Sequence, residues 1–150
     1  MQIITLEDFL EIIAENGNPP YLYSLDNVNW QTSNIFKNLD AGIYQIYVKS
    51  QINSCTAVAT SAVLFIPNAF TPNQDGYNDV WKVSNIEFFS NVKLKIFDKF
   101  GIQVFTAEDV LKFNWNGLYN GRILPSGTYW YVMEIDGHYT RTGWILLKNR

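Results

Sequence analysis

The side chains whose types and spacing could do chemistry lie in one stretch near the middle of the chain. Oxygen-bearing residues follow one another there around a glycine, in the order Thr71, Asn73, Asp75, Gly76 and Asp79. Alternating oxygen ligands around a glycine that permits a sharp turn are typical of a calcium-binding loop. However, Lys82 stands where such a loop carries a bidentate glutamate. A cation site is therefore the weaker of two interpretations.

The second interpretation needs no ligand. Asn and Asp side chains readily accept hydrogen bonds from backbone N–H groups a few residues away, in Asx turns. We expect Asn73, Asp75 and Asn78 to satisfy local N–H groups in this way. The sequence then predicts neither a resident metal nor any other cofactor.

Catalytic arrangements find little support elsewhere in the chain. Asp75 and Asp79 could flank a glycosidic bond, although a hydrolase of this kind needs both carboxylates to converge on one cleft. His138 is the sole histidine, so it is also the sole imidazole that could serve Ser126 or Cys55 in a nucleophilic triad. It follows a predicted hairpin turn, where we expect an exposed strand residue. We therefore expect no catalytic residue and no enzymatic activity.

The composition indicates a folded β protein. Of the 150 residues, 47% are hydrophobic and 16% aromatic, whereas only 17% are charged. Abundant aromatic and β-branched residues favour strands over helices. The net charge is −3, with −4 on residues 1–66 and +1 on the remainder. Neither half carries the basic stripe that phosphate backbones require, so we expect no nucleic-acid partner.

Cysteine content and hydropathy limit other classes of protein. Cys55 is the single cysteine, which excludes an intrachain disulfide and predicts a small buried side chain. The apolar runs are far shorter than the roughly 18 residues that a membrane-spanning helix needs. The first residues also lack the basic region and long apolar region of a secretory signal. If the protein is exported, we expect these residues to be a fragment of a longer precursor.

The first half of the chain contains short strands separated by turn signals. Residues 3–15 are ambiguous, because their apolar spacing fits either a helix or strands. The stretch GNPPYLYSLDNVNW, followed by NIFKNLDAGIYQIYVKSQINSC, resembles repeat modules of large bacterial surface adhesins. In such modules the residues before PPY form strands, which favours strands at 3–6 and 9–14. Further strands are expected at 21–25, 43–49 and 55–65.

The second half has a similar density of strands. Val92, Leu94 and Ile96 alternate with Lys93 and Lys95, the pattern of a half-buried strand. A tight hairpin with Gly101 at positive φ is expected to follow, and then turns at the two Asn-Gly dipeptides. A long hairpin over 129–147, with its turn at Asp136-Gly137, closes the chain. Seven strands over about 84 residues are typical of an immunoglobulin-like sandwich.

The three aromatic residues Tyr129, Trp130 and Tyr131 stand in succession on one predicted strand. Because successive side chains point to opposite faces of a strand, at least one ring must face outwards or meet another layer. Exposed aromatic rings often mark docking surfaces. For Trp130 both a core position and a docking position remain open.

Residues 66–150 resemble the gliding-motility-associated C-terminal domain, which is the type B sorting domain of the type IX secretion system. The resemblance lies in a series of motifs in the family order: IPNAFTPNQDGYNDVW, VKLKIFDKFGIQVF, WNGLYNG, LPSGTYWY and GWILLKN. The family usually has Asn-Gly-Asp-Gly in the first motif, whereas this chain has Gln74 in place of the first glycine. That departure makes the first turn less permissive.

The resemblance implies an immunoglobulin-like sandwich that directs a folded cargo through the periplasm and outer membrane to the cell surface or exterior. Its implied partners are the type IX translocon and a small outer-membrane β-barrel protein of the PorP/SprF type. Prolines that fix the first motif in advance reduce the ordering cost of binding. The expected recognition residues are Pro67, Asn68, Phe70, Pro72, Asn73, Asp75, Gly76, Asn78, Asp79 and Trp130.

Together these patterns predict an all-β protein with two tandem immunoglobulin-like β-sandwich modules. Residues 1–65 form an adhesin-like repeat and residues 66–150 the sorting domain, and the fragment is expected to be monomeric. The alternative is a carbohydrate-binding or adhesive tandem, in which exposed aromatics stack on sugars and the Asp75 region holds calcium.

Overall fold

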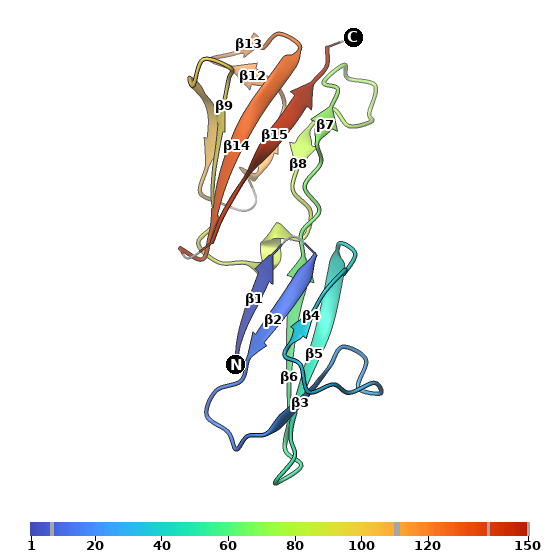
Figure 1. Cartoon of the computed structure of the whole chain (residues 1–150). Helices are drawn as coiled ribbons and strands as arrows, with labels where there is room; N and C mark the ends of the chain where they lie inside the picture. The colour runs from blue at the N-terminus through green and yellow to red at the C-terminus, as the bar shows by residue number, and fades with distance from the viewer. Residues whose placement is uncertain (7, 110–111, 138, 150) are drawn as a thin grey trace. The chain divides into compact units, whose positions relative to one another are not determined.

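The computed structural model describes residues 1–6, 8–109, 112–137 and 139–149. The predicted all-β class is confirmed, because the described chain consists of strands and loops with one short 3-10 helix (Figure 1). Its contacts divide it into two compact units, Met1–Phe65 and Ile66–Arg150. None of the described helices is long and apolar enough to cross a membrane.

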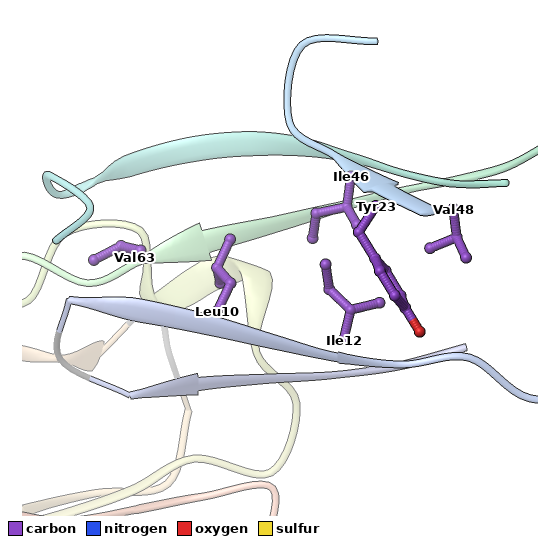
Figure 2. Close-up of a cluster of buried hydrophobic side chains, with 6 residues drawn as sticks. All are labelled: Leu10, Ile12, Tyr23, Ile46, Val48 and Val63. Carbon is purple, nitrogen blue, oxygen red and sulfur yellow. The ribbon is translucent and has the colours of Figure 1, made fainter. Parts of the chain in front are cut away.

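The first unit packs two three-stranded sheets face to face. One sheet has the order β1-β2-β4 and the other the order β3-β5-β6. Apolar side chains from β2, β3, β5 and β6 fill the space between the sheets, as Figure 2 shows. The strands are β1 (Gln2–Leu6), β2 (Phe9–Ile13), β3 (Tyr21–Ser24), β4 (Ile35–Phe36), β5 (Gly42–Ser50) and β6 (Thr56–Val63).

The ambiguous first segment is an antiparallel hairpin of β1 and β2, as predicted from the adhesin-like pattern. Leu10 and Ile12 on β2 are fully buried, whereas their neighbours along the strand are only half-buried. The burial pattern along β2 thus has the period of two of a strand, which excludes a helix for this segment. Each buried aliphatic side chain contributes about 1.5–3 kcal/mol of transfer free energy to this core.

One prediction for the first unit is wrong. Cys55 is exposed rather than buried. It lies one residue before β6, in the loop that follows β5, where the Asn53 side chain accepts a hydrogen bond from the Cys55 N–H (3.2 Å). The first residues of β6, which follow Cys55, are also exposed.

The second unit is built on a five-stranded sheet with the order β10-β9-β14-β15-β7. Its strand pairs are antiparallel except for β7, which runs parallel to β15. A pair of short strands, β8 and β11, and a small hairpin, β12 and β13, complete the described unit. The elements are β7 (Ala69–Phe70), β8 (Trp81–Lys82), η1 (Ile86–Phe88), β9 (Lys93–Phe97), β10 (Gln103–Ala107), β11 (Asn114–Trp115), β12 (Leu118–Tyr119), β13 (Arg122–Ile123), β14 (Gly127–Ile135) and β15 (Tyr139–Leu147).

The described part of this unit contains nine strands where seven were expected, because five of them have only two residues. Turn-forming residues interrupt these pairings early; Asn120 and Gly121, for example, both have positive φ and close the β12–β13 hairpin. The predicted β9 alternation, the positive φ of Gly101 and the β14–β15 hairpin are all confirmed. His138 lies outside the described residues.

Large aromatic side chains form the core of the second unit. Trp81 and Trp115 are fully buried on β8 and β11. The Trp81 ring packs on Tyr131 with a centroid distance of 5.5 Å, and the Trp115 ring packs on Tyr129 at 5.2 Å. Both tyrosines belong to β14, so these contacts fix the short β8–β11 pair against the five-stranded sheet.

Gly143 on β15 is tightly enclosed by this core. A Cβ atom at this position would lie 2.6–2.8 Å from the Tyr131 ring, which is itself buried against Trp81. We expect Gly143→Ala to lower the free energy of unfolding by about 1–3 kcal/mol, because the ring must move. Gly127→Ala is the control, since a Cβ there meets nothing within 4 Å. Denaturant unfolding of both variants checks this, and equal stabilities would contradict it.

Asp26 organises the turn after β3. Its carboxylate accepts hydrogen bonds from the backbone N–H groups of Asn29 (2.7 Å) and Val28 (2.8 Å) and from the Asn29 side-chain amide (2.6 Å). The bonds from Asn29, followed by those from Val28 and Ser24, hold the pKa of Asp26 well below its usual value.

A pH dependence follows from this lowered pKa. The folded-state pKa lies below the unfolded value of about 4, so the stabilising effect is complete above that value and is lost as the pH falls below it. We expect the difference in unfolding free energy between the wild type and Asp26→Asn to shrink between pH 5 and roughly pH 2. Denaturant titrations at several pH values measure this. A difference that grows on acidification would contradict the assignment.

Candidate functional site

Residues 67–80, here called the Asx loop, include the short strand β7 and lead from it into β8. The Thr71 N–H donates to the Asn78 carbonyl at 2.8 Å, which closes the loop at its base. The Asn73 N–H donates to the Thr71 carbonyl at 2.8 Å and tightens the first turn. The backbone is therefore held by its own hydrogen bonds.

Side-chain oxygens hold the tip of the Asx loop. Asp79 accepts from the Gln74 N–H (2.6 Å) through Oδ1 and from the Gly76 N–H (2.8 Å) through Oδ2. Asp75 Oδ1 accepts from the Tyr77 N–H at 2.8 Å, and Asn73 Oδ1 accepts from the Asp75 N–H at 3.3 Å. The predicted Asx-turn arrangement is confirmed for Asn73 and Asp75.

Asn78 differs from its predicted role. Asp79 provides the side-chain acceptors that were expected from Asn78, whereas Asn78 contributes its carbonyl and a positive φ of 52°. Asparagine tolerates this left-handed conformation better than most residues. The side-chain oxygens of Asn73, Asp75 and Asp79 thus accept N–H groups. The described residues contain no group of three or more His, Cys, Asp or Glu side chains that could hold a metal ion.

The loop forms one wall of a pocket of about 390 Å³. The lining residues from the Asx loop are Pro72, Gln74, Gly76, Asp79 and Val80. The second wall comes from the segment around the β12–β13 hairpin, with Asn116, Leu118 and Ile123. Val80 and Ile123 are exposed apolar side chains, so the pocket offers both apolar contacts and a charged carboxylate.

The remaining predicted loop residues join the loop to the core. The Pro67 carbonyl accepts the indole N–H of Trp81 at 2.6 Å, and the Asn68 carbonyl accepts the Leu146 N–H at 2.8 Å. Phe70 is buried, with its ring 5.2 Å from that of Trp115. These three residues position the loop, whereas the pocket residues are available to a partner.

Trp130 faces solvent on the outer side of the five-stranded sheet. Its side chain is 52% exposed, whereas Tyr129 and Tyr131 are buried on the other face. Trp144 on β15 lies directly opposite Trp130 and is 50% exposed. Together with the exposed Leu146 they form what we call the outer aromatic face (Trp130, Trp144 and Leu146). The core position left open for Trp130 is thus excluded, and its role in docking stays a prediction.

Tyr129 shows how strongly the opposite face of β14 is buried. Burial, followed by the negative charge of Asp98, raises the pKa of the Tyr129 phenol. The hydroxyl donates to the Pro125 carbonyl at 2.8 Å. The phenol therefore stays protonated and structural, while its neighbour Trp130 is presented to solvent.

Neither the second wall of the pocket nor the exposure of Trp144 opposite Trp130 was predicted from the sequence. Leu118 and Ile123 are apolar residues that flank the Asn120-Gly121 turn, and apolar side chains beside an exposed turn are a usable signal. Trp144 shares the alternation of β15, in which even-numbered residues face outwards. Neither signal says which loops come together in space.

Residues 64–147 match the family described as the CHU_C type IX secretion signal domain. The chain belongs to this family. The matched stretch includes the whole Asx loop, both pocket walls and the outer aromatic face. No curated protein matches the chain.

Membership in the type IX secretion signal family establishes the broad function. The chain carries a sorting signal, interacts with the type IX secretion system and is directed to the cell surface or the exterior. The match favours this function over the carbohydrate-binding alternative. The adhesin-like character of residues 1–65 stays a prediction, because the match begins at residue 64.

Gln74 occupies a conformation that suits glycine, with φ of 63°. A side chain in the left-handed region costs about 1–2 kcal/mol, whereas the extra freedom of glycine in the unfolded chain costs about 0.4–1 kcal/mol. We expect Gln74→Gly to raise the free energy of unfolding by roughly 0.5–1 kcal/mol. Gln103→Gly, at an exposed position of strand β10, should instead destabilise. Denaturant unfolding measures the stability of both variants. A Gln74→Gly variant that is less stable than the wild type would contradict backbone strain at Gln74.

Proposed function

We propose that the Asx loop and the pocket beside it form the recognition surface of this type IX sorting signal. Support comes chiefly from the pocket, whose loop wall is held in place by hydrogen bonds to Asp79 and Asp75. A surface that is ordered before binding loses little conformational freedom when a partner docks. The signal is therefore a folded shape and not a linear peptide.

The proposed partner is a small outer-membrane β-barrel protein of the PorP/SprF type within the translocon. A partner loop that places an apolar side chain between Val80 and Ile123 would bury exposed apolar surface of the pocket. A donor group on the same loop could reach Asp79 at the pocket wall. The cargo would then pass from the periplasm across the outer membrane.

In this proposal the chain acts as a sorting signal and not as an enzyme. The carboxylates of Asp75 and Asp79 both accept backbone N–H groups, which suits a structural role. Residues 1–65 would be the last adhesin-like repeat of a secreted or surface protein. Catalytic activity of that protein would reside outside these residues.

A secretion assay tests the recognition surface. Residues 1–150 are fused behind a reporter in a bacterium that has a type IX system, and surface delivery is measured by protease accessibility of the reporter. We expect Ile123→Glu to reduce delivery at least tenfold, because a charge replaces an apolar pocket wall. Ile123 is 70% exposed, so the change should alter stability by less than about 0.5 kcal/mol.

Ile102→Glu is the matched control, since Ile102 is also exposed but lies on the β9–β10 hairpin and does not line this pocket. It should leave delivery unchanged. Thermal unfolding of both purified variants establishes that each is folded. Normal delivery of Ile123→Glu, or equal loss in both variants, would refute the proposed surface.

A further inference from the structure

The pocket beside the Asx loop is negatively charged. Of the lining residues that the structure describes, Asp79 alone carries a charge. The Asx loop as a whole has the carboxylates of Asp75 and Asp79 and no Lys or Arg. Lys82 and Arg122 adjoin the lining segments in the sequence, but neither of them lines the pocket. A ligand that enters the pocket therefore meets one carboxylate and no cation.

The carboxylate of Asp79 can accept further hydrogen bonds. Oδ1 accepts the Gln74 N–H at 2.6 Å, and Oδ2 accepts the Gly76 N–H at 2.8 Å. A carboxylate has about four lone-pair positions, so each oxygen can accept a second donor. The ion pairs among the residues that the structure describes lie elsewhere, and none of them involves Asp79. The backbone thus holds this carboxylate in place without neutralising its charge.

Apolar side chains lie beside this carboxylate. Val80, Leu118 and Ile123 are exposed and line the pocket, together with the ring of Pro72. An occupant that covers these side chains removes apolar surface from water, which favours binding. The pocket therefore offers an apolar surface and one negative charge within a volume of about 390 Å³.

Gly117 allows the two walls of the pocket to approach each other. It stands between Asn116 and Leu118 of the second wall, and a Cβ atom there would lie 3.3 Å from the ring of Pro72 in the Asx loop. The Gly117 carbonyl accepts the Leu124 N–H at 3.0 Å, which holds this backbone in place. The pocket is therefore formed in the chain alone, and its shape and charge select the occupant.

Few side chains suit both the charge and the apolar surface of this pocket. Asp79 would repel an acidic side chain, and an apolar side chain alone would take the carboxylate out of water without pairing it, which is costly. Lysine and arginine each combine an apolar stem with a cationic head. Arginine matches a carboxylate better, because its planar guanidinium can donate one N–H to each of the two oxygens.

We propose that the pocket binds one arginine side chain of the type IX partner protein. This inference rests on the proposed function and names the side chain that the pocket receives. The guanidinium pairs with the carboxylate of Asp79, and the aliphatic stem lies between Val80 and Ile123. A single residue of the partner then makes both the apolar contact and the contact with the carboxylate.

A pair of variants at Gln74 tests the sign of the charge that the pocket accepts. Gln74 is exposed, lines the pocket and donates its N–H to Asp79. Gln74→Lys adds a cation that repels arginine and competes for Asp79, so we expect about tenfold less surface delivery of the reporter fusion of residues 1–150. Gln74→Glu keeps the same backbone conformation with the opposite charge and should be delivered at least as well as the wild type.

The outcomes separate this inference from the proposed recognition surface. Thermal unfolding establishes that both Gln74 variants are folded. If Ile123→Glu loses delivery while the two Gln74 variants are delivered equally, the surface stands and the arginine inference is overturned, because an uncharged occupant does not distinguish the two signs. If Ile123→Glu is delivered normally, the surface and the arginine inference fail together.

A titration of the purified chain tests the side chain without secretion. N-acetyl-arginine methylamide is added, and NMR follows the backbone amides of Gln74 and Gly76, whose N–H groups donate to Asp79. We expect saturable shifts at both amides. N-acetyl-citrulline methylamide has nearly the same shape without the charge and should bind about tenfold more weakly, because it forms no charge-assisted pair. No saturable shift at these amides, or equal affinity for the two compounds, would overturn the inference.

Discussion

The hydrogen bond from the Trp81 indole N–H to the Pro67 carbonyl is the contact on which the arrangement of the second unit depends. A buried indole needs an acceptor, since leaving its N–H unpaired costs roughly 1–3 kcal/mol. By accepting this bond, Pro67 is fixed at the start of the Asx loop while the Trp81 ring packs on Tyr131 of β14. One interaction thus connects the core with the start of the Asx loop.

The Asx loop shows how polar residues can fix shape without binding an ion. Its carboxylates accept N–H groups that would otherwise point into solvent, and three of its residues, Gln74, Gly76 and Asn78, take positive φ. Such a loop loses its conformational freedom when the chain folds and not when a partner binds. This suits a signal that has to be recognised while attached to an unrelated cargo.

Local patterns predicted local structure well, because side-chain period and turn chemistry act over a few residues. The β9 alternation and the turn at Gly101 are examples. The orientation of Trp130 could not be predicted from the sequence, because alternation separates odd from even residues without showing which set faces the core. Cys55 was misplaced because the apolar residues that follow it in β6, Ala57 and Val58, are themselves exposed. The pocket depends on which loops meet in space, which the sequence does not display.

Strands β14 and β15 each bury one face and expose the other, because successive side chains point to opposite sides of a strand. Tyr129 and Tyr131 hold the aromatic core, while Trp130 on the same strand and Trp144 opposite it face solvent. Substitutions on the outer face can therefore change the exposed surface with little effect on packing. The pocket, in contrast, is formed by two segments that are separate in the sequence, residues 72–80 and 116–123. Neither segment alone forms the pocket, so a partner that binds the pocket, as we propose, can recognise the signal only after the second unit has folded.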